Sequence, residues 1–593
     1  MPRVVAVALV AAAVQATAQD STRAVTRVAA QDAARAVACE GHLISAIDIR
    51  PQSPYFAGLT GQWRWIARRA TSLHATTRAK VIRRFLLVHV GEPCTGIGLE
   101  ESERVLRAQP FLAEARVSAY DDGNGGVRID VFTVDEIGLL AGLNAQSGSP
   151  YVTRVLLGEG NLAGQGIQAS ADWHYYQFYR DRYAASLIDY DFLAKPYRLQ
   201  VDAIRQPEGG LWDVGLTHPF LSELQRAAWV VSGGSQRVFY GFQSPTFPNN
   251  FDIPAVDYTR SYWQVGGIVR VGAPGKFSLF GLSLSQEREV VSRTPVALTD
   301  SGLIKDTVSA TAPELTNRFA HVTQSGRVNI LWGFRDVDFL RVSGFDVLSG
   351  DEDLRRGFQF GTFFGHGLSA LGTRGEDTFV SSAVYFGAGT TQWFTGLQAQ
   401  GEGRENDVTH GWDGILVSGR WAAYYKPAGN QVFILDEEYG LGIRQRIPFQ
   451  LGFADFRGGI RGYRLSQDAG GERSVSRFEY HFALPPIRQL AQVGVGPFVD
   501  AGKLWAQDTP FGVSTPFTFS TGLSLFIAIP PRSRRMWRFD VAFPVTNEPH
   551  VHGVEFRFTT QTFSYTSYTF YQEPQDLARA REPVVPGSIF NYP

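Results

Sequence analysis

Residues 477–482 have the sequence RFEYHF, in which charged or polar side chains occupy the odd positions and aromatic side chains the even ones. The same alternation recurs in 197–203 (YRLQVDA), 537–543 (WRFDVAF) and 554–561 (VEFRFTTQ). A period of two residues indicates β-strands with one face suited to hydrocarbon and the other to water.

Alternation alone does not separate a soluble β-sandwich from a membrane barrel, because a sandwich strand also has one apolar face. Here the segments are about 9–14 residues long, whereas soluble strands usually have ~5–6 residues. They also fill almost all of residues 136–563. A closed sheet is the only strand structure that pairs every backbone polar group inside lipid. We therefore predict a transmembrane barrel. Five strands are clear, at 474–484, 493–505, 517–529, 536–545 and 552–563, and about eleven to sixteen candidates precede them.

The charge balance of the chain excludes one class of protein. The chain has 593 residues and a formal net charge of −1, which does not suit a nucleic-acid binder.

The start of the chain, with Arg3, an apolar run and Ala16-Thr17-Ala18, predicts a signal peptide over 1–18 that is removed before Gln19. Residues 19–40 are expected to be a loose N-terminal segment, and 564–593 a polar, Tyr- and Pro-rich tail.

Residues 41–135 combine helix and strand signals. They predict the order β-α-α-β-β, with strands at 42–50, 115–120 and 127–134 and helices at 76–87 and 99–108. Cys39 and Cys94 are the two cysteines of the chain. Outside the cytoplasm they could form a disulfide, and two unpaired thiols are an equal alternative.

Five blocks of the sequence resemble the Omp85 superfamily of outer-membrane assembly proteins, which includes the BamA/TamA-like proteins and the bacterial surface antigens of the D15 type. Residues 41–135 resemble a single POTRA domain. The other blocks are GEGNLAGQG at 158–166, GGIRGY at 458–463, GPFVDAG at 496–502 and RFDVAFP at 538–544. The resemblance implies an all-β barrel of sixteen antiparallel strands over 136–563, in the bacterial outer membrane, with the POTRA domain in the periplasm. Assembly members of the family usually carry several POTRA domains, whereas the resemblance here covers one.

The resemblance also implies a site inside the barrel. In the family, the sixth loop folds into the lumen and its arginine meets acidic residues of the wall. The corresponding motif here is Gly459, Ile460, Arg461, Gly462 and Tyr463. By the same resemblance Glu479 and Asp500 are the partners of Arg461, and the alternation of their strands places both carboxylates on the lumenal face. The alternative is an ordinary lumenal ion pair without a special role.

A second expected site is the seam between the first and last strands. Glycines weaken a strand, and an open strand edge is a template for another strand. The candidate residues are Gly138, Gly142 and Asn144 on the first strand and Phe556, Phe558 and Phe563 on the last. The alternative is that the glycines only fit the curvature of the barrel.

Three functions remain open on these residues. The first is an outer-membrane factor that captures unfolded or nascent client proteins with its POTRA domain and inserts them through the seam, with accessory periplasmic or lipoprotein subunits as possible partners. The second is a polypeptide-secreting or passive channel, and the third a structural surface-antigen barrel. The motifs G-x-S-x-G, H-E-x-x-H and C-x-x-C are absent. We therefore expect no enzymatic activity, catalytic residue, metal, cofactor or nucleic-acid partner.

Overall fold

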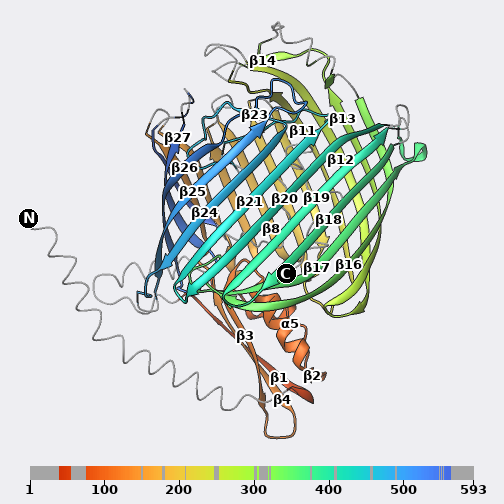
Figure 1. Ribbon diagram of the computed structural model, residues 1–593. Coiled ribbons are helices and arrows are strands. Elements are labelled where there is room, and N and C mark those ends of the chain that lie inside the picture. Colours follow the sequence, from red (N-terminus) through yellow and green to blue (C-terminus); the bar gives the residue numbers. More distant parts are fainter. Residues whose placement is uncertain are drawn as a thin grey trace, which may run out of the picture.

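The computed structural model describes residues 39–54 and 75–561 with short internal gaps, the longest at 246–252 and 306–314. The expected signal peptide, Phe563 and the tail 564–593 lie outside the described residues. The chain forms a large antiparallel barrel with a small α+β domain at one of its ends (Figure 1). Within the described ranges, no helix has the length and apolar character needed to cross a membrane.

The wall of the barrel is a closed antiparallel sheet. In chain order its strands are β5 (Leu139–Gln146), β6 (Val152–Glu159), β7 (Ile167–His174), β8 (Arg182–Phe192), β9 (Tyr197–Gln206), β10 (Gly209–His218), β11 (Ala227–Gly241), β12 (Ile253–Ala273), β13 (Lys276–Val291), β16 (Val322–Ser343), β17 (Asp351–Gly367), β18 (Asp377–Gly389), β19 (Trp393–Asn406), β20 (Gly411–Ala428), β21 (Gln431–Ile443), β24 (Glu472–Ala483), β25 (Gln492–Trp505), β26 (Thr518–Ala528), β27 (Met536–Val545) and β28 (Glu555–Gln561). Short 3₁₀ turns lie at η2 (Leu162–Gly164) and η3 (Ser369–Leu371).

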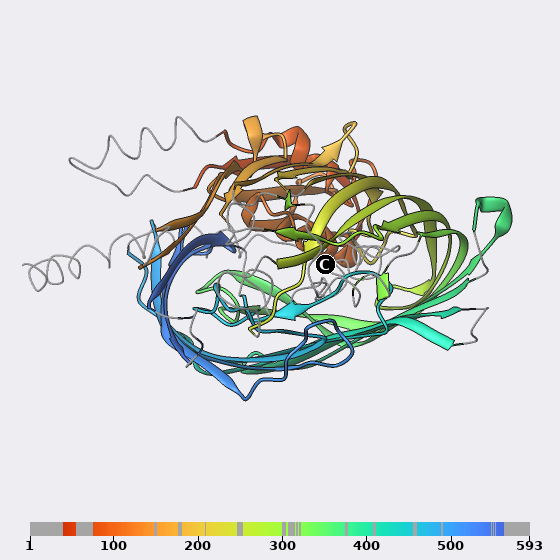
Figure 2. The same cartoon turned by 90° about the horizontal axis from the view of Figure 1, so that it is seen from above.

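Among the described residues the wall has 20 strands, so the expected number of sixteen is wrong. That number came from the family resemblance. The alternation pattern itself allowed more strands, because its candidates before residue 472 numbered about eleven to sixteen. The diameter of a barrel grows roughly linearly with its strand number, so this wall encloses a wider lumen than sixteen strands would. Seen from above, the strands form a ring with loop segments inside it (Figure 2).

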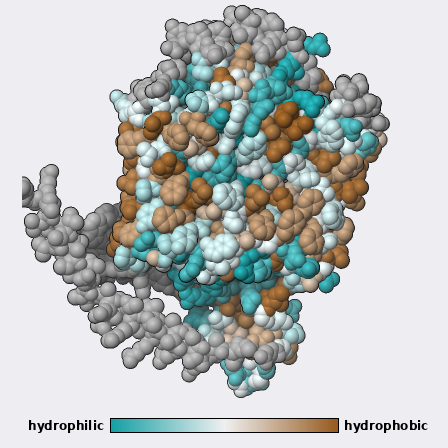
Figure 3. Space-filling model, viewed as in Figure 1, coloured by the Kyte–Doolittle hydropathy of each residue, from teal (hydrophilic) through white to brown (hydrophobic). Residues whose placement is uncertain are grey.

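The alternating side chains point as the sequence predicts. Phe478 and Val499 are exposed on the outside of the wall, at 46% and 45%, whereas Glu479 and Asp500 are enclosed, at 1% and 0%. Apolar side chains are spread over the outer wall (Figure 3). The outer surface is therefore the face suited to lipid, and the charged side chains share the interior.

The wall varies in height around the ring. Strands β5, β6 and β7 have 8 residues each, whereas β12 has 21 and β16 has 22. The two ends of the wall meet on the short side, where β28 pairs with β5. The barrel is therefore lowest beside its own seam.

The small domain is built on a four-stranded sheet in the order β2-β1-β4-β3. Its elements are β1 (Glu40–Gln52), α4 (Ala79–Arg84), β2 (Pro93–Thr95), α5 (Gly96–Arg107), β3 (Leu112–Asp121) and β4 (Val127–Asp135). They follow the predicted order, with the short strand β2 in addition. Thr95 caps α5, its Oγ1 accepting a hydrogen bond from the backbone N–H of Gly98 at 3.2 Å. Cys39 and Cys94 form a disulfide that ties the start of β1 to β2.

The small domain is docked on the turns at its end of the barrel. Arg107 of α5 donates two hydrogen bonds to Asp353 of β17, at 2.8 and 2.9 Å. Glu136, just after β4, accepts from the backbone N–H groups of Arg534 and Arg535 in the β26–β27 turn, at 2.8 and 3.2 Å. The β17 and β26–β27 contacts belong to strands well separated in ring order, and the two turns meet where Arg532 donates to Asp351 at 2.8 Å. The domain therefore covers part of this mouth of the barrel.

Loops at the opposite end of the barrel share an apolar core. Its buried members come from the loops after β11, β13, β21 and β27, and include Phe242, Phe319, Phe449 and Val551. Short pairings add to this cover: β14 (Val296–Leu298) with β15 (Ile304–Lys305), and β22 (Leu451–Gly452) with β23 (Ala469–Gly470). The loops therefore pack on one another over this mouth.

We predict that Leu523→Arg weakens the folded barrel. Leu523 lies near the middle of β26 and is 53% exposed on the outer wall. An arginine facing lipid near the midplane costs about 2–4 kcal/mol. The folded fraction, measured in lipid vesicles by heat-modifiable gel mobility, should fall. Leu224→Arg, in the β10–β11 turn, is the matched control and should have little effect. Equal effects of the two changes would contradict this orientation of the wall.

Candidate functional site

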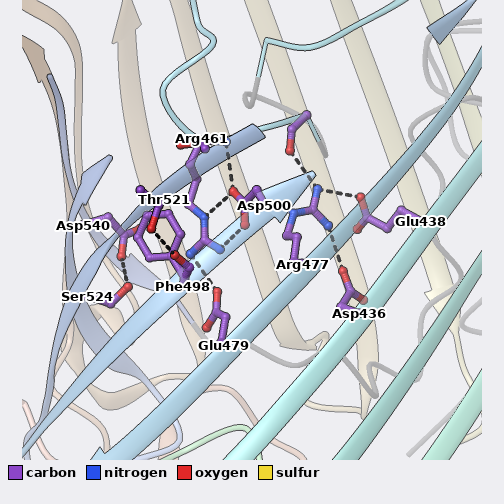
Figure 4. Close-up of polar contacts among 12 residues, drawn as sticks. Asp436, Glu438, Arg461, Arg477, Glu479, Phe498, Asp500, Thr521, Ser524 and Asp540 are labelled. Atoms are coloured by element: carbon purple, nitrogen blue, oxygen red, sulfur yellow. Dashed lines mark hydrogen bonds and ion pairs between the residues drawn. The ribbon is translucent and has the colours of Figure 1, made fainter. Parts of the chain in front are cut away.

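The loop between β21 and β24 brings Arg461 into the barrel. The Arg461 side chain is enclosed by the inner faces of β24 and β25 (Figure 4). Its Nε and Nη2 donate to the two oxygens of Asp500, at 2.7 and 2.5 Å, and its Nη1 donates to Oε1 of Glu479 at 2.7 Å. Its backbone N–H adds a bond of 3.1 Å to Asp500. These are the two carboxylates that the sequence singled out as partners of this arginine.

The geometry suits a guanidinium rather than an ammonium group. The planar fork of Arg461 places two parallel bonds on Asp500 and one on Glu479, an arrangement that a lysine cannot copy. The guanidinium carbon also lies 3.5 Å from the centre of the Phe498 ring. Contact with the ring adds cation–π attraction on the remaining face. The arginine is therefore held in one orientation from three sides.

The loop between β21 and β24 corresponds to the sixth loop of the family resemblance and is called loop 6 below. The other residues of its motif set how closely it approaches the wall. Gly462 has φ +88°, a left-handed conformation that favours glycine. A Cβ on Gly459 would lie 2.2 Å from the carbonyl oxygen of Phe453, so only glycine fits there. Tyr463 is buried and donates its hydroxyl to the carbonyl oxygen of Phe519 on β26, at 2.9 Å. Ile460 is buried in the apolar core of the loops.

Four residues that were not among the predicted site residues extend the arginine cage. Arg538 of β27 donates to Oε1 of Glu479 at 2.8 Å and, through Nε, to Asp540 at 2.7 Å. Arg557 of β28 donates to Asp540 at 2.8 Å. His481 of β24 lies beside the other oxygen of Glu479, with its Nε2 at 2.7 Å. The alternation had placed Arg538 and Asp540 on one face, but their partners depend on the register between strands.

A second charge cluster lies beside the first. Arg477 of β24 donates to Asp436 and Glu438 of β21, at 2.8 and 2.9 Å, and to the carbonyl oxygen of Gly459 at 2.9 Å. Arg420 of β20 donates to the other oxygen of Asp436 at 2.7 Å. Loop 6 is therefore held by both clusters. Among the described residues, no group of three or more His, Cys, Asp or Glu side chains could hold a metal ion.

Loop 6 has a further anchor outside the wall. The backbone N–H of Gln467 donates to Glu548 in the β27–β28 loop at 2.8 Å. Burial, with a contribution from the nearby Asp468, raises the pKa of Glu548 to about 7. The folded protein therefore holds a proton on this carboxyl that the unfolded chain releases near pH 4.5.

The seam joins β28 to β5 by few pairs. Among the described residues, which end at Gln561, five residue pairs connect the two strands, from Glu555↔Gln146 to Thr559↔Gly142. The β16–β17 pairing, by comparison, has 17 pairs. Beyond Gly142, the Thr560 side chain replaces the backbone ladder, because its Oγ1 accepts from the N–H of Ala141 at 2.7 Å and donates to its carbonyl oxygen at 2.8 Å.

The predicted seam residues are placed as follows. Gly142 and Asn144 lie in β5, and Asn144 is the Cα partner of Arg557. Phe556 and Phe558 lie in β28, and Phe558 is the Cα partner of Leu143. Gly138 comes just before β5 and packs closely against Glu159, so it is not part of the seam ladder. Phe563 lies outside the described residues.

The fold and the site together define a closed antiparallel β-barrel with a loop fixed inside it and a small domain docked at one end. No protein-family model matches the chain, and no curated protein matches it. Similar solved structures include BamA from Haemophilus ducreyi lacking POTRA domains 1–3, at 11% identity and a TM-score of 0.35 over 88% of this chain and 84% of that one. CdiB from Escherichia coli aligns at 11% identity and a TM-score of 0.37, over 88% and 76% of the two chains. The copper transporter OprC aligns at 8% identity and a TM-score of 0.35, over 74% and 85%. These values are too low to establish a family, so function has to be argued from the residues.

We predict that Arg461→Ala destabilises the barrel by about 3–5 kcal/mol, because it leaves the enclosed carboxylates of Asp500 and Glu479 without a partner. The midpoint of heat-modifiable unfolding should fall. Arg461→Lys should recover only part of the loss, since an ammonium group cannot form the fork. An unchanged midpoint for the alanine variant would leave an ordinary lumenal ion pair as the better description.

We also predict a pH effect at the outer anchor of loop 6. Because the pKa of Glu548 is raised when the protein is folded, its contribution to stability is lost as the pH rises from about 4.5 through about 7. Glu548→Gln removes this loss. The melting temperature of the variant minus that of the unaltered protein should therefore increase between pH 5 and pH 8. A difference that stays constant over this range would contradict the assignment.

Proposed function

We propose that the protein is an outer-membrane assembly factor of the Omp85 type, which inserts client proteins through the seam between β28 and β5. The observation that carries the proposal is the seam, which has five residue pairs between the described parts of β28 and β5, on the lowest side of the wall. A strand edge with so few pairs needs the least work to separate. Once separated, it offers unpaired N–H and C=O groups to an incoming strand.

The loop-6 motif supports the same proposal. Arg461, Glu479 and Asp500 form the arrangement that the family resemblance implies. The two carboxylates lie on β24 and β25, within four strands of the seam strand β28. The cage fixes this loop to the inner faces of β24 and β25, within the last five strands of the wall. The cage is therefore best explained as part of the machinery that sets the state of the seam.

The two ends of the barrel fit insertion through the wall better than free passage through the lumen. The small domain is docked on the turns at one mouth, and packed loops cover the other. In this proposal the small domain is a POTRA domain that faces the periplasm and presents its strand edges to unfolded clients. The bilayer, the clients and accessory periplasmic or lipoprotein subunits are the partners, and the reaction needs no cofactor or enzymatic step.

Secretion of a polypeptide through the lumen is the second candidate. The 20 strands favour it, because a wider ring leaves more room once loop 6 and the small domain move. The two candidates differ in whether the seam has to open.

A disulfide across the seam tests this difference. Leu143 and Phe558 are Cα partners in β5 and β28, so Leu143→Cys with Phe558→Cys should lock the seam. Insertion of client barrels into vesicles should be abolished and should return on reduction. The control pair, Phe539→Cys with Phe558→Cys, links β27 to β28 and leaves the seam free. Full insertion by the locked protein would refute the seam proposal, and polypeptide export that survives the lock would favour the secretion pore.

A further inference from the structure

The enclosed charges of the barrel form an alternating chain from loop 6 to the last strand. In order, its members are Asp500, Arg461, Glu479, Arg538, Asp540 and Arg557, and every link is a hydrogen-bonded ion pair of 2.5–2.8 Å. Negative and positive groups alternate without interruption. The chain therefore connects the loop to β28 through β24 and β27, without passing through the backbone ladder of the strands between them.

Glu479 is the branch point of this chain. Its carboxylate is 1% exposed, and its Oε1 accepts from both Arg461 and Arg538, at 2.7 and 2.8 Å. If Arg461 leaves, the carboxylate has to redistribute its bonds between Arg538, which shares the same oxygen, and His481, which lies 2.7 Å from the other oxygen. Hydrogen bonds in a low-dielectric interior polarise one another, so a change at one link is felt at the next.

Asp540 passes the connection to the last strand. One of its oxygens accepts from Arg538 at 2.7 Å and from the hydroxyl of Ser524 at 2.6 Å, and the other accepts from Arg557 at 2.8 Å. Asp540 and Arg557 are also Cα partners in β27 and β28. The inner face of β28 is thus fastened to the same cage that holds loop 6.

The chain reaches the seam at Arg557. Across it, the Cα partner of Arg557 is Asn144 of β5. Asn144 is buried, and its Oδ1 has no hydrogen-bond partner among the residues that the structure describes. Arg557 therefore ties β28 to the cage by an ion pair, whereas the Oδ1 of Asn144 on β5 has no hydrogen-bond partner among the described residues.

We propose that Arg538, Asp540 and Arg557 are positioning residues that couple loop 6 to the seam. While Arg461 is in its cage, the chain holds β28 in register for pairing with β5. When Arg461 leaves, Arg557 loses its fixed partner geometry, and the five-pair seam separates more readily. This inference rests on the proposed function for its biological purpose, but the coupling itself is a property of the isolated protein.

Hydrogen–deuterium exchange of the purified full-length protein in lipid nanodiscs tests the coupling. Asp540→Asn and Arg557→Gln should each speed exchange of the β5–β28 backbone amides by about tenfold, the change expected from losing one charge-assisted hydrogen bond. The matched control is Glu287→Gln, which removes an equally enclosed carboxylate, ion-paired with Arg260, from β13 on a distant part of the wall. It should leave seam exchange unchanged.

A double variant decides whether the links act as one unit. Arg461→Ala with Asp540→Asn should raise seam exchange no further than the larger of the two single changes, because both break the same chain. Multiplicative effects would mean independent contacts and would overturn the coupling. So would unchanged seam exchange in folded Asp540→Asn and Arg557→Gln. If Asp540→Asn fails to fold, Arg557→Gln carries the test, since its side chain is 19% exposed.

The readout separates this inference from the proposed function. Coupled exchange in a protein that inserts no client would contradict the function and support the coupling. If clients are inserted but Asp540→Asn and Arg557→Gln leave amide exchange at the seam unchanged, the function is supported and the coupling is overturned.

Discussion

A sheet that spans a membrane has to pair its last strand with its first, and in the described part of this chain five residue pairs between β28 and β5 make that closure. Every other pairing in the described wall is longer, and the strands beside the closure are the shortest of the barrel. The pairing between β28 and β5 is therefore the weakest link of the closed sheet. The enclosed charges of loop 6 and of the last strands lie next to that place.

Enclosed ion pairs are a costly way to hold a loop, because both groups lose their water. An apolar loop would pack against the wall without this loss of hydration free energy. Arg461 and its partners instead provide a connection that is strong when complete and that fails when one member leaves. That property suits a loop that switches between a bound and a released state better than a loop that only packs in the lumen. The second cluster, around Arg477, holds the same loop and limits how it can move.

Much of the wall could be predicted from local alternation. The pattern at residues 477–482 identified which side chains face outward, and the outward Phe478 and enclosed Glu479 follow it. The expected strand number was wrong because it was taken from the family resemblance, whereas the alternation pattern itself allowed more strands. The link from Arg538 to Arg557 also escaped prediction. Which charges meet across β27 and β28 depends on strand register, and register follows from turns and pairings that a single strand does not encode.

The central claim, that clients enter the membrane where β28 meets β5, is tested most directly by photo-crosslinking during client insertion. A photoreactive residue in place of Leu143, on the outer face of β5, should capture the client. The same probe in place of Leu282, which is exposed on the outer face of β13, should capture lipid only. Client adducts at Leu143 and none at Leu282 are the predicted result. Equal capture at both positions, or capture at neither while insertion proceeds, would contradict the account.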